Sequence, residues 1–347
     1  MTRVYLDHNA TTALVPAARE AMLKAMDSVG NPSSVHAEGR GAKRIVETAR
    51  QQITLAMGAN GADVIFTSSA TESAALALGG RALASAPIEH DAVLAWTSGD
   101  LPVTSDGTVA VSDPAQSTLQ LANSETGVVQ ALPNRLALSD MTQGFGKIPV
   151  AFDWSGVTAA MVSAHKIGGP KGVGALVIKQ GTDVEAQIKG GGQEMGRRSG
   201  TENVIGIAGF GAAATAATQA LSEGEWEKTA QLRDLLEEGL EALPHPPIFY
   251  GKGASRLPNT SCFVARGWKG ETQVMLMDLA GFAVSAGSAC SSGKVKPSGV
   301  LRAMGADALD ASCALRVSLG PRTTKDEIER FVDAWSQAYE KHRLKAA

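Results

Sequence analysis

A lysine-containing turn and two polar residues at a strand end are the first features that could support chemistry. Lys166 and Lys171 lie in SAHKIGGPKGVGAL, between the apolar segments AAMVSA and VGALVIK, and Asp140 and Gln143 follow the apolar segment LALS. The carboxyl ends of strands form the ligand crevice of open α/β sheets, so we expect these residues at one sheet edge. A lysine for a Schiff base and an aspartate that keeps a pyridine nitrogen protonated are what a pyridoxal phosphate (PLP) enzyme needs. Taken singly, the lysine could also be an ordinary surface residue of a turn, and the aspartate could belong to a turn or cap a helix.

A third segment, FTSSATESAALALGG, could hold a phosphate group. It predicts a strand, a Ser/Thr-rich turn and the start of a helix, where backbone N–H groups and the helix dipole favour an anion. Ser69, Ala70 and Thr71 are the candidate contacts. Ser69 or Thr71 could equally act only as the cap of that helix.

One histidine and one cysteine complete the set of reactive candidates. His90, in APIEHDAVLAW, precedes a strand-like run and could lie above a cofactor ring, although a structural role fits it as well. Cys290 lies in SAGSACSSGKVKPSG, a small-residue segment with two lysines. A nearby cation raises the thiolate fraction, so Cys290 is a candidate nucleophile, with an incidental surface thiol as the alternative. Cys262 and Cys313 lie in apolar runs and are predicted to be core residues.

The elements that position these residues follow an alternating pattern. Strand-like segments (ADVIFT, TLQLANSE, LALSD, AAMVSA and VGALVIK) alternate with helical ones (ESAALALGGRALAS and IGIAGFGAAATAATQALSE), which predicts an α/β fold with a mostly parallel sheet. We expect a large domain over 13–225 and a smaller α/β domain formed by 1–12 and 226–347. The smaller one contains the strands PIFYG, NTSCFVA, FAVSAG and CALRVSLG and ends in a helix over about 324–344. The stretch 92–124 is rich in turn residues.

Composition narrows the classes of partner. The chain has 347 residues, 44% of them hydrophobic, with a formal net charge of −3. This charge gives no basic field for nucleic acid or for a membrane surface, so small molecules or proteins are the expected partners. The N-terminal MTRVYLDHNATTALVP lacks a signal-peptide pattern, and no later apolar run is expected to cross a bilayer, so a cytoplasmic location is expected. The three cysteines fit neither a zinc site nor a disulfide framework.

Taken together, the motifs resemble those of the cysteine desulfurases of the nitrogen-fixation and iron–sulfur-cluster type, in the class V aminotransferase family. These belong to the fold-type I, aspartate-aminotransferase-like PLP enzymes. The resemblance runs nearly end to end, through YLDHNATT, GNPSSVH, FTSSATES, EHDAVL, SAHKIGGPKGVGAL, GGGQEMGRRSGTEN, RLPN, SAGSACSS and RVSLG in that order.

The resemblance implies a role for each candidate. It makes Lys166 the Schiff-base lysine, Asp140 the partner of the pyridine nitrogen and Gln143 a partner of the ring hydroxyl. His90 would stack on the ring, Arg316 would bind the substrate carboxylate, and Cys290 would receive sulfur. The implied cofactor contacts are Ala70, Thr71, His90, Ser124, Asp140, Gln143, Ser163, His165, Lys166 and Thr201, the last reaching the phosphate of the other subunit in a homodimer.

The implied function is removal of sulfur from L-cysteine, giving alanine and a persulfide on Cys290. Freed Lys166 would move the substrate α-proton, and His90 would serve proton transfers at the substrate thiol. The sulfur would pass to a protein acceptor such as an iron–sulfur scaffold, and Cys290 could transiently ligate an iron–sulfur cluster; no resident metal site is predicted. A selenocysteine lyase, a class V aminotransferase and a non-catalytic sulfur carrier or scaffold are the alternatives.

Two departures from the family pattern affect this expectation. Where two asparagines usually precede Glu-Thr-Gly, this chain has Asn123 followed by Ser124, whose side chain is shorter. The chain is also shorter than usual between His90 and Ser124 and between Gly127 and Asp140, so peripheral helices are expected to be missing there. The spacing after Cys290 matches the subgroup with a long cysteine loop, which delivers sulfur to partner proteins.

Overall fold

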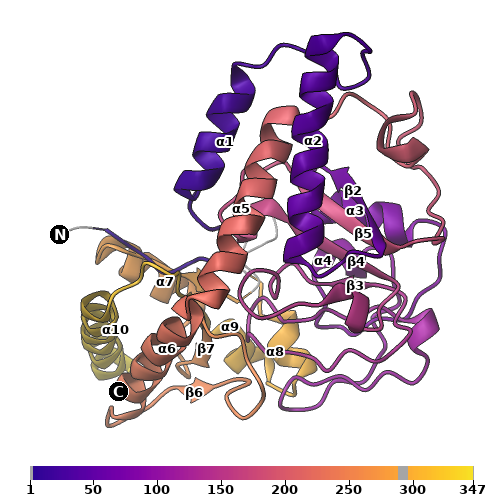
Figure 1. Cartoon of the computed structure of the whole chain (residues 1–347). Helices are drawn as coiled ribbons and strands as arrows, with labels where there is room; N and C mark the ends of the chain where they lie inside the picture. Colours follow the sequence, from indigo (N-terminus) through magenta and orange to yellow (C-terminus); the bar gives the residue numbers. More distant parts are fainter. Residues whose placement is uncertain (1–2, 288–295, 347) are drawn as a thin grey trace.

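The computed structural model describes residues 3–287 and 296–346; Cys290 lies outside them. The described residues form two four-stranded sheets and one two-stranded sheet, and Figure 1 shows the helices around them. The α-helices are α1 (Pro16–Met26), α2 (Ala37–Ala56), α3 (Ala70–Leu78), α4 (Asp91–Leu94), α5 (Val204–Ser222), α6 (Glu225–Glu241), α7 (Gly270–Leu279), α8 (Gly299–Ala303), α9 (Ala308–Ser312) and α10 (Lys325–Ala346). The strands are β1 (Val4–Tyr5), β2 (Ala62–Thr67), β3 (Ser139–Asp140), β4 (Ala159–Ser163), β5 (Gly174–Lys179), β6 (Ile248–Phe249), β7 (Thr260–Val264), β8 (Phe282–Ala283), β9 (Ser285–Ala286) and β10 (Ala314–Ser318). Short 3-10 turns are η1 (Pro114–Gln116), η2 (Phe152–Trp154), η3 (Ala164–Lys166) and η4 (Gln193–Gly196).

The larger sheet has the strand order β2-β5-β4-β3. β3 is parallel to β4, and parallel bridges join Thr118 to Leu138 and Ala84 to Ser117, whereas β5 runs antiparallel to both its neighbours. Two parallel neighbouring strands need a connection of a dozen or more residues. Because only residues 164–173 connect β4 to β5, these two strands are antiparallel. The predicted mostly parallel sheet is therefore confirmed, with β5 as its reversed strand.

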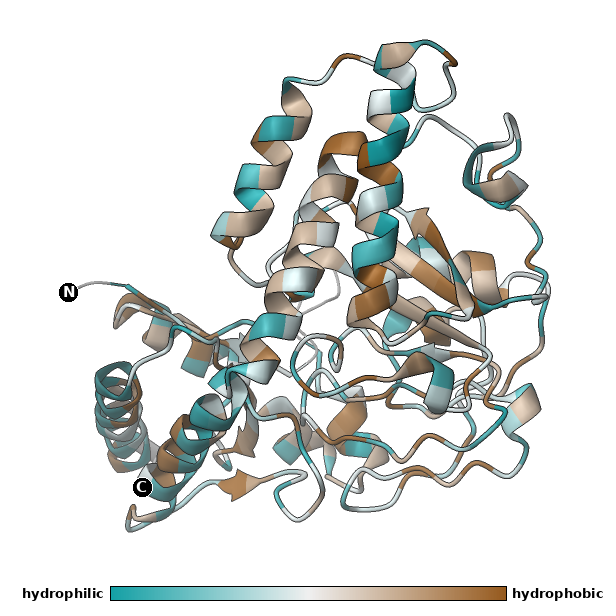
Figure 2. Cartoon of the chain, in the orientation of Figure 1, coloured by the Kyte–Doolittle hydropathy of each residue, from teal (hydrophilic) through white to brown (hydrophobic). Residues whose placement is uncertain are grey.

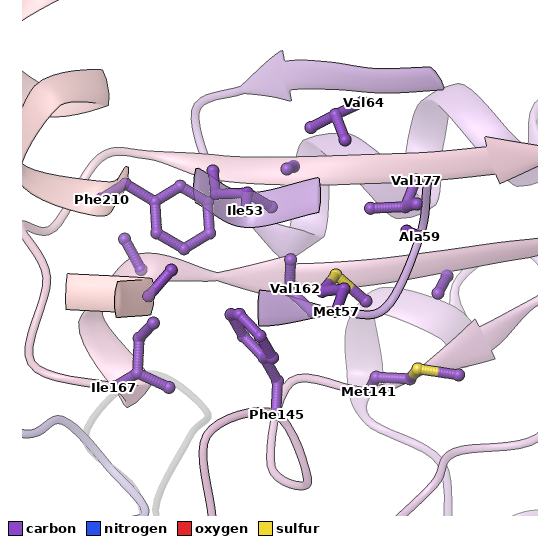
Figure 3. Close-up of a cluster of buried hydrophobic side chains, with 14 of the residues drawn as sticks. Ile53, Met57, Ala59, Val64, Met141, Phe145, Val162, Ile167, Val177 and Phe210 are labelled. Carbon is purple, nitrogen blue, oxygen red and sulfur yellow. The ribbon is translucent and has the colours of Figure 1, made fainter. Parts of the chain in front are cut away.

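The two faces of this sheet follow the two-residue period of its strands. Val64, Val162 and Val177 point to one face, where they pack against α2 and α5 through residues such as Ile53 and Phe210, as Figure 3 shows. The alternate positions (Ile65, Ala159, Met161, Leu176 and Ile178) pack with α3 on the opposite face. Burial on both faces explains why these segments are apolar throughout.

The central helix α5 corrects one expectation. The sequence was expected to contain no apolar run long enough to cross a bilayer. By length and composition α5 is such a run, with a mean hydropathy of 1.5. In the fold this helix packs against α1 and α2 (Figure 1), and Phe210, Ala213 and Ala214 are fully buried. Figure 2 shows α5 with few hydrophilic residues, in contrast to α10. The apolar composition of α5 is thus that of a core helix.

The smaller sheet, β6-β7-β10-β9, is antiparallel throughout. One face packs on α6, α7 and α10 through Phe263, Leu315 and Trp335. The other face, with Cys262 and Val264, packs on α8, on α9 with its cap residue Cys313, and on residues 86–88. β1 pairs with β8, and Val4 and Leu6 join the core of this second unit. This grouping supports the expected division at 12/13 and 225/226, which remains a prediction.

Two local predictions were wrong. The helix expected over 72–85 is α3 and ends at Leu78, because Gly79 and Gly80 follow and Gly80 has a left-handed φ of 75°. The strand-like run after His90 is the short helix α4, which His90 caps. Between 95 and 138 the secondary structure consists of η1 and isolated bridges, in line with the expected loss of peripheral helices.

Candidate active site

Lys166 lies at the edge of the larger sheet, at the end of η3 and directly after β4. Its side chain is half-buried, and Nζ donates hydrogen bonds to the carbonyl oxygens of Asn9 (2.7 Å) and Ala10 (2.9 Å). Lys171 is exposed in the turn that leads to β5. Of the two rival lysines, Lys166 is therefore the one held against the N-terminal segment.

Asp140 and Gln143 meet Lys166 at this edge. Asp140 ends β3, which runs parallel to β4, so both strands present their carboxyl ends on the same side. Gln143 is buried, and its Nε2 donates to the carbonyl oxygen of Asn9 at 3.0 Å. Lys166 and Gln143 thus share one acceptor atom, although they lie on different segments.

Asn9 is a residue that the sequence reasoning missed. Its Nδ2 donates to the hydroxyl of Thr260 (2.8 Å) and to the carbonyl oxygen of Ser124 (3.1 Å). Its Oδ1 accepts from Nζ of Lys147 (2.8 Å) and from Nδ2 of Asn259 (3.1 Å). The side chain is fully buried and fully hydrogen-bonded, and the backbone carbonyl oxygen of the same residue accepts from Lys166, so Asn9 links both units of the fold to the lysine. YLDHNATT was recognised as a motif, but no residue in it was assigned a role.

The predicted phosphate segment begins α3. Ser69 is the N-cap, and its hydroxyl accepts a hydrogen bond from the backbone N of Glu72 at 3.4 Å, which supports the capping interpretation for this residue. Ala70 is half-buried and Thr71 is exposed on the first turn. A Cβ on Gly174 would lie 2.6 Å from the carbonyl carbon of Ser69, so the glycine lets β5 pass close to this helix start.

Ser163 and His165 flank the lysine turn from the β4 side. Ser163 is buried, and His165 is half-buried with Nδ1 3.2 Å from the hydroxyl of Thr11. Burial, followed by the charges of Lys166 and Lys171, lowers the pKa of His165 to about 4. His165 is therefore a neutral group at pH 7, suited to a hydrogen bond rather than to an ion pair.

Thr201 is exposed at the end of a loop that is fixed at Glu194. The Glu194 carboxylate is buried and accepts from Nη1 and Nη2 of Arg50 (2.8 and 3.0 Å) and from the backbone N of Phe66 (2.8 Å). Glu194 and Met195 have left-handed φ angles of 48° and 58°, which cost free energy in a non-glycine residue. The ion pair with Arg50 holds this strained turn against β2.

His90 is exposed, and its Nδ1 accepts a hydrogen bond from the backbone N of Ala92 at 3.1 Å. The preceding Glu89 is buried, and its Oε1 accepts from the backbone N of Gln120 at 2.6 Å. Burial, with a smaller contribution from the charge of Asp140, raises the pKa of Glu89 to about 8. Glu89 is a second residue that the sequence reasoning missed, because an acidic residue beside a histidine carries no signal of burial.

Arg316 lies on β10 of the smaller sheet and is buried. Its Nη2 pairs with Oδ1 of Asp7 at 2.5 Å, and its Nη1 donates to the carbonyl oxygen of Ser124 at 3.2 Å. Its Nε has no hydrogen-bond partner among the residues that the structure describes. Ser124 thus reaches the arginine through its backbone. A buried guanidinium with one unsatisfied donor can accept an additional carboxylate ligand.

Cys290 was predicted as the nucleophile and lies outside the described residues. Ser298, at the start of α8, donates its hydroxyl to Oε2 of Glu125 at 2.6 Å, and Glu125 follows Ser124. The chain after Cys290 is therefore anchored next to the residue that Arg316 contacts. Cys262 and Cys313 are fully buried, which confirms their prediction as core residues, and burial raises the pKa of the Cys262 thiol.

Comparisons with known proteins identify the family. The sequence matches the Aminotransferase class-V family over residues 4–97 and 114–331. The chain belongs to this family.

Among the relatives of this class-V chain, a cysteine desulfurase of Cereibacter sphaeroides is 38% identical, covering 96% of this chain and 95% of that protein. An IscS-like cysteine desulfurase of Mycobacterium tuberculosis is 34% identical, and the match covers 99% of this chain and 98% of that protein. The crystal structure of a NifS-like protein from Rickettsia africae has a TM-score of 0.89 and 33% identity, and the match covers 97% of this chain and 99% of that chain.

Class-V aminotransferases are PLP enzymes, and the residues at the sheet edge fit this cofactor. A primary amine, a carboxylate and an amide donor are provided by Lys166, Asp140 and Gln143. Two buried oxygens at the same edge, Oγ1 of Thr142 and Oε2 of Glu89, have no hydrogen-bond partner within the described parts of the chain. Unsatisfied buried polar atoms are rare and mark a place where a further group is expected.

One cavity adjoins Lys166 without reaching the other cofactor candidates. It measures about 390 Å³ and is lined by His8, Ile167, Lys147 and Trp226, among others. Neither Asp140 nor Thr71 lines it, so it is not the volume that the ring would fill. Within 3–287 and 296–346, no group of three or more His, Cys, Asp or Glu side chains could hold a metal ion.

Proposed function

We propose that this protein is a cysteine desulfurase, which removes sulfur from L-cysteine, releases L-alanine and holds the sulfur as a persulfide on Cys290. The observation that carries the proposal is the shared acceptor of Lys166 and Gln143 beside Asp140, which gathers the three polar groups that PLP needs. The names of relatives with 34 to 38% identity over nearly the whole chain support the choice of reaction.

The residues that would hold PLP come from several segments of the chain. Lys166 would bind it covalently, Asp140 would keep the pyridine nitrogen protonated, and Gln143 would donate to the ring hydroxyl. His90 would stack on the ring. The phosphate contacts would be Ala70, Thr71, Ser163 and His165, with Thr201 from the second subunit. Bound PLP supplies an electron sink for the electron pair of the substrate Cα–H bond.

The chain's own groups would then bind cysteine and move protons. Nε of Arg316, which has no hydrogen-bond partner within 3–287 and 296–346, would hold the substrate carboxylate. Lys166 would move the α-proton, and His90 would exchange protons with the substrate thiol. The Cys290 thiolate would attack the substrate sulfur: a sulfur–sulfur bond forms, the Cβ–S bond breaks, and its electron pair and a proton remain on the alanine carbon.

We further propose a cytoplasmic homodimer that passes sulfur to a protein acceptor such as an iron–sulfur scaffold, with no nucleic-acid or membrane partner. The exposed position of Thr201, on a loop fixed at Glu194, supports a contact with a second copy. The anchoring of α8 beside Ser124 and Arg316 supports a position of Cys290 within reach of the substrate.

A product assay tests the reaction. The PLP-loaded protein is incubated with L-cysteine and a reductant, and sulfide and alanine are measured together; equal amounts of both are expected. Cys290→Ser should still bind PLP and respond spectrally to cysteine, but it should yield almost no sulfide or alanine, because serine cannot hold a persulfide. Cys313→Ser is the matched control and should keep turnover. Normal turnover by Cys290→Ser, pyruvate and ammonia as products, or a protein that stays colourless with PLP would contradict the proposal.

A further inference from the structure

Lys147 is a buried lysine to which neither the sequence nor the proposed reaction gives a role. Its side chain is 2% exposed, and it is among the largest fully buried side chains. Nζ donates to Oε1 of Gln143 at 2.7 Å and to Oδ1 of Asn9 at 2.8 Å. Turns at Phe145 and Ile148, whose N–H groups donate to Met141 and Gly144, bring residues 143 and 147 to the same side. Lys147 therefore contacts the side chain of Asn9 and that of Gln143, whose Nε2 shares the Asn9 carbonyl oxygen with the Lys166 amine.

The surroundings of Lys147 favour its uncharged form. No carboxylate oxygen of the described residues lies within ion-pair distance of Nζ, and the charged groups facing it are Lys166 and Arg316. Burial, followed by the charges of these two residues, places the pKa of Lys147 well below its usual value. The two hydrogen bonds from Nζ end on side-chain oxygens, Oε1 of Gln143 and Oδ1 of Asn9.

These two hydrogen bonds fix the direction of the Gln143 amide. An amide can turn over without changing shape, and the surrounding donors and acceptors decide which end is nitrogen. Here Oε1 faces Lys147, and Nε2 faces the carbonyl oxygen of Asn9. If Nε2 leaves Asn9 to donate to a ring hydroxyl, the bond to Lys147 is the remaining contact that keeps the amide in this direction.

We propose that Lys147 is a positioning residue for the cofactor: as a buried hydrogen-bond donor it holds the Gln143 amide so that Nε2 points to the ring hydroxyl. This inference rests on the proposed function, in which Gln143 contacts PLP. Lys147 itself touches neither substrate nor cofactor in this role, so its effect should pass entirely through Gln143.

The test uses the PLP-loaded protein and the pH titration of its visible absorbance. Lys147→Met keeps the volume of the side chain and removes both donors. Without an oriented donor, the ring oxygen is less stabilised when the proton of the lysine–cofactor linkage leaves, so the titration midpoint should rise by about one pH unit, the effect of one hydrogen bond to a charged group. Gln143→Leu should raise it similarly. Lys179→Met, at the end of β5, is the matched control and should leave it unchanged.

The double variant decides between positioning and general stabilisation. In the Gln143→Leu background, Lys147→Met should add no further shift, because the amide on which it acts is gone. An unchanged midpoint in Lys147→Met, or an equal further shift in the double variant, would overturn the inference. If Lys147→Met loses cooperative unfolding, Lys147→Gln takes its place; it keeps a neutral N–H donor on a shorter chain and should give a smaller shift of the same sign. A parent protein without visible absorbance would instead refute the proposed function.

Discussion

The ion pair between Glu194 and Arg50 provides the sharpest quantitative prediction. Glu194→Ala removes a carboxylate that accepts three hydrogen bonds, two from Arg50 and one from the backbone N of Phe66. The Phe66 N–H would be left buried and unsatisfied, which costs about 1–3 kcal/mol. Breaking a buried ion pair from one side typically costs about 3–5 kcal/mol. Arg50 keeps a second partner in Glu47, and its side chain is 18% exposed, so we expect the lower end, about 3 kcal/mol in the free energy of unfolding.

Urea unfolding followed by circular dichroism measures this loss, with the slope checked for constancy between variants. Glu185→Ala is the matched control, since its carboxylate pairs with Lys189 on the surface and both side chains are more than 70% exposed. That variant should change the free energy of unfolding by less than about 0.5 kcal/mol. A loss of under about 1 kcal/mol in Glu194→Ala, or equal losses in both variants, would show that the buried pair does not hold the loop.

Three further predictions concern the site and its environment. Borohydride reduction of the PLP-loaded protein followed by peptide mapping should place the adduct on Lys166; an adduct on Lys171 would overturn the assignment. Mixed dimers of Lys166→Ala and Thr201→Ala subunits should regain activity if the sites are shared; no recovery beyond that of independent sites would exclude sharing. His8 and His165 have folded pKa values of about 4, below the usual 6.5, chiefly because they are buried. The neutral forms are favoured in the fold, so stability should be full above about pH 6.5 and fall as the pH drops toward 4. A urea midpoint that is constant from pH 7 to pH 5 would contradict this, and His165→Asn should flatten part of the decline.

The sequence could predict those parts of the fold that local patterns determine. Strands β2, β4 and β5 are short apolar runs bounded by turn residues, and both Lys166 and Asp140 directly follow such runs, so their placement at one sheet edge was within reach. The reversal of β5 could also be inferred from the short connection that precedes it. The last helix, expected over about 324–344, is α10 and extends to Ala346.

The residues that were missed depend on contacts between distant segments. Asn9 acquires its role from Thr260 and Asn259, about 250 residues away, and no local pattern marks that meeting. The local sequence QGFGKIP gives no sign that Lys147 is buried. Its burial follows from packing around Gln143. The run after His90 has strand-like composition, but the histidine caps it as a helical turn. For Asn9 and Lys147 tertiary context outweighed local pattern, whereas at His90 a local cap decided.

The network around Asn9 also constrains the order in which the protein can be assembled during synthesis. Its backbone N–H donates to the hydroxyl of Ser318, which is 309 positions later in the chain, and β1 pairs with β8 near residue 282. The carbonyl oxygen of Asn9, which holds Lys166, therefore reaches its final position only after nearly the whole polypeptide has left the ribosome. Contacts of such long sequence separation form late and slowly. The larger sheet can be complete while the lysine still lacks its acceptor, so the capacity to bind the cofactor should be acquired as a last step of maturation.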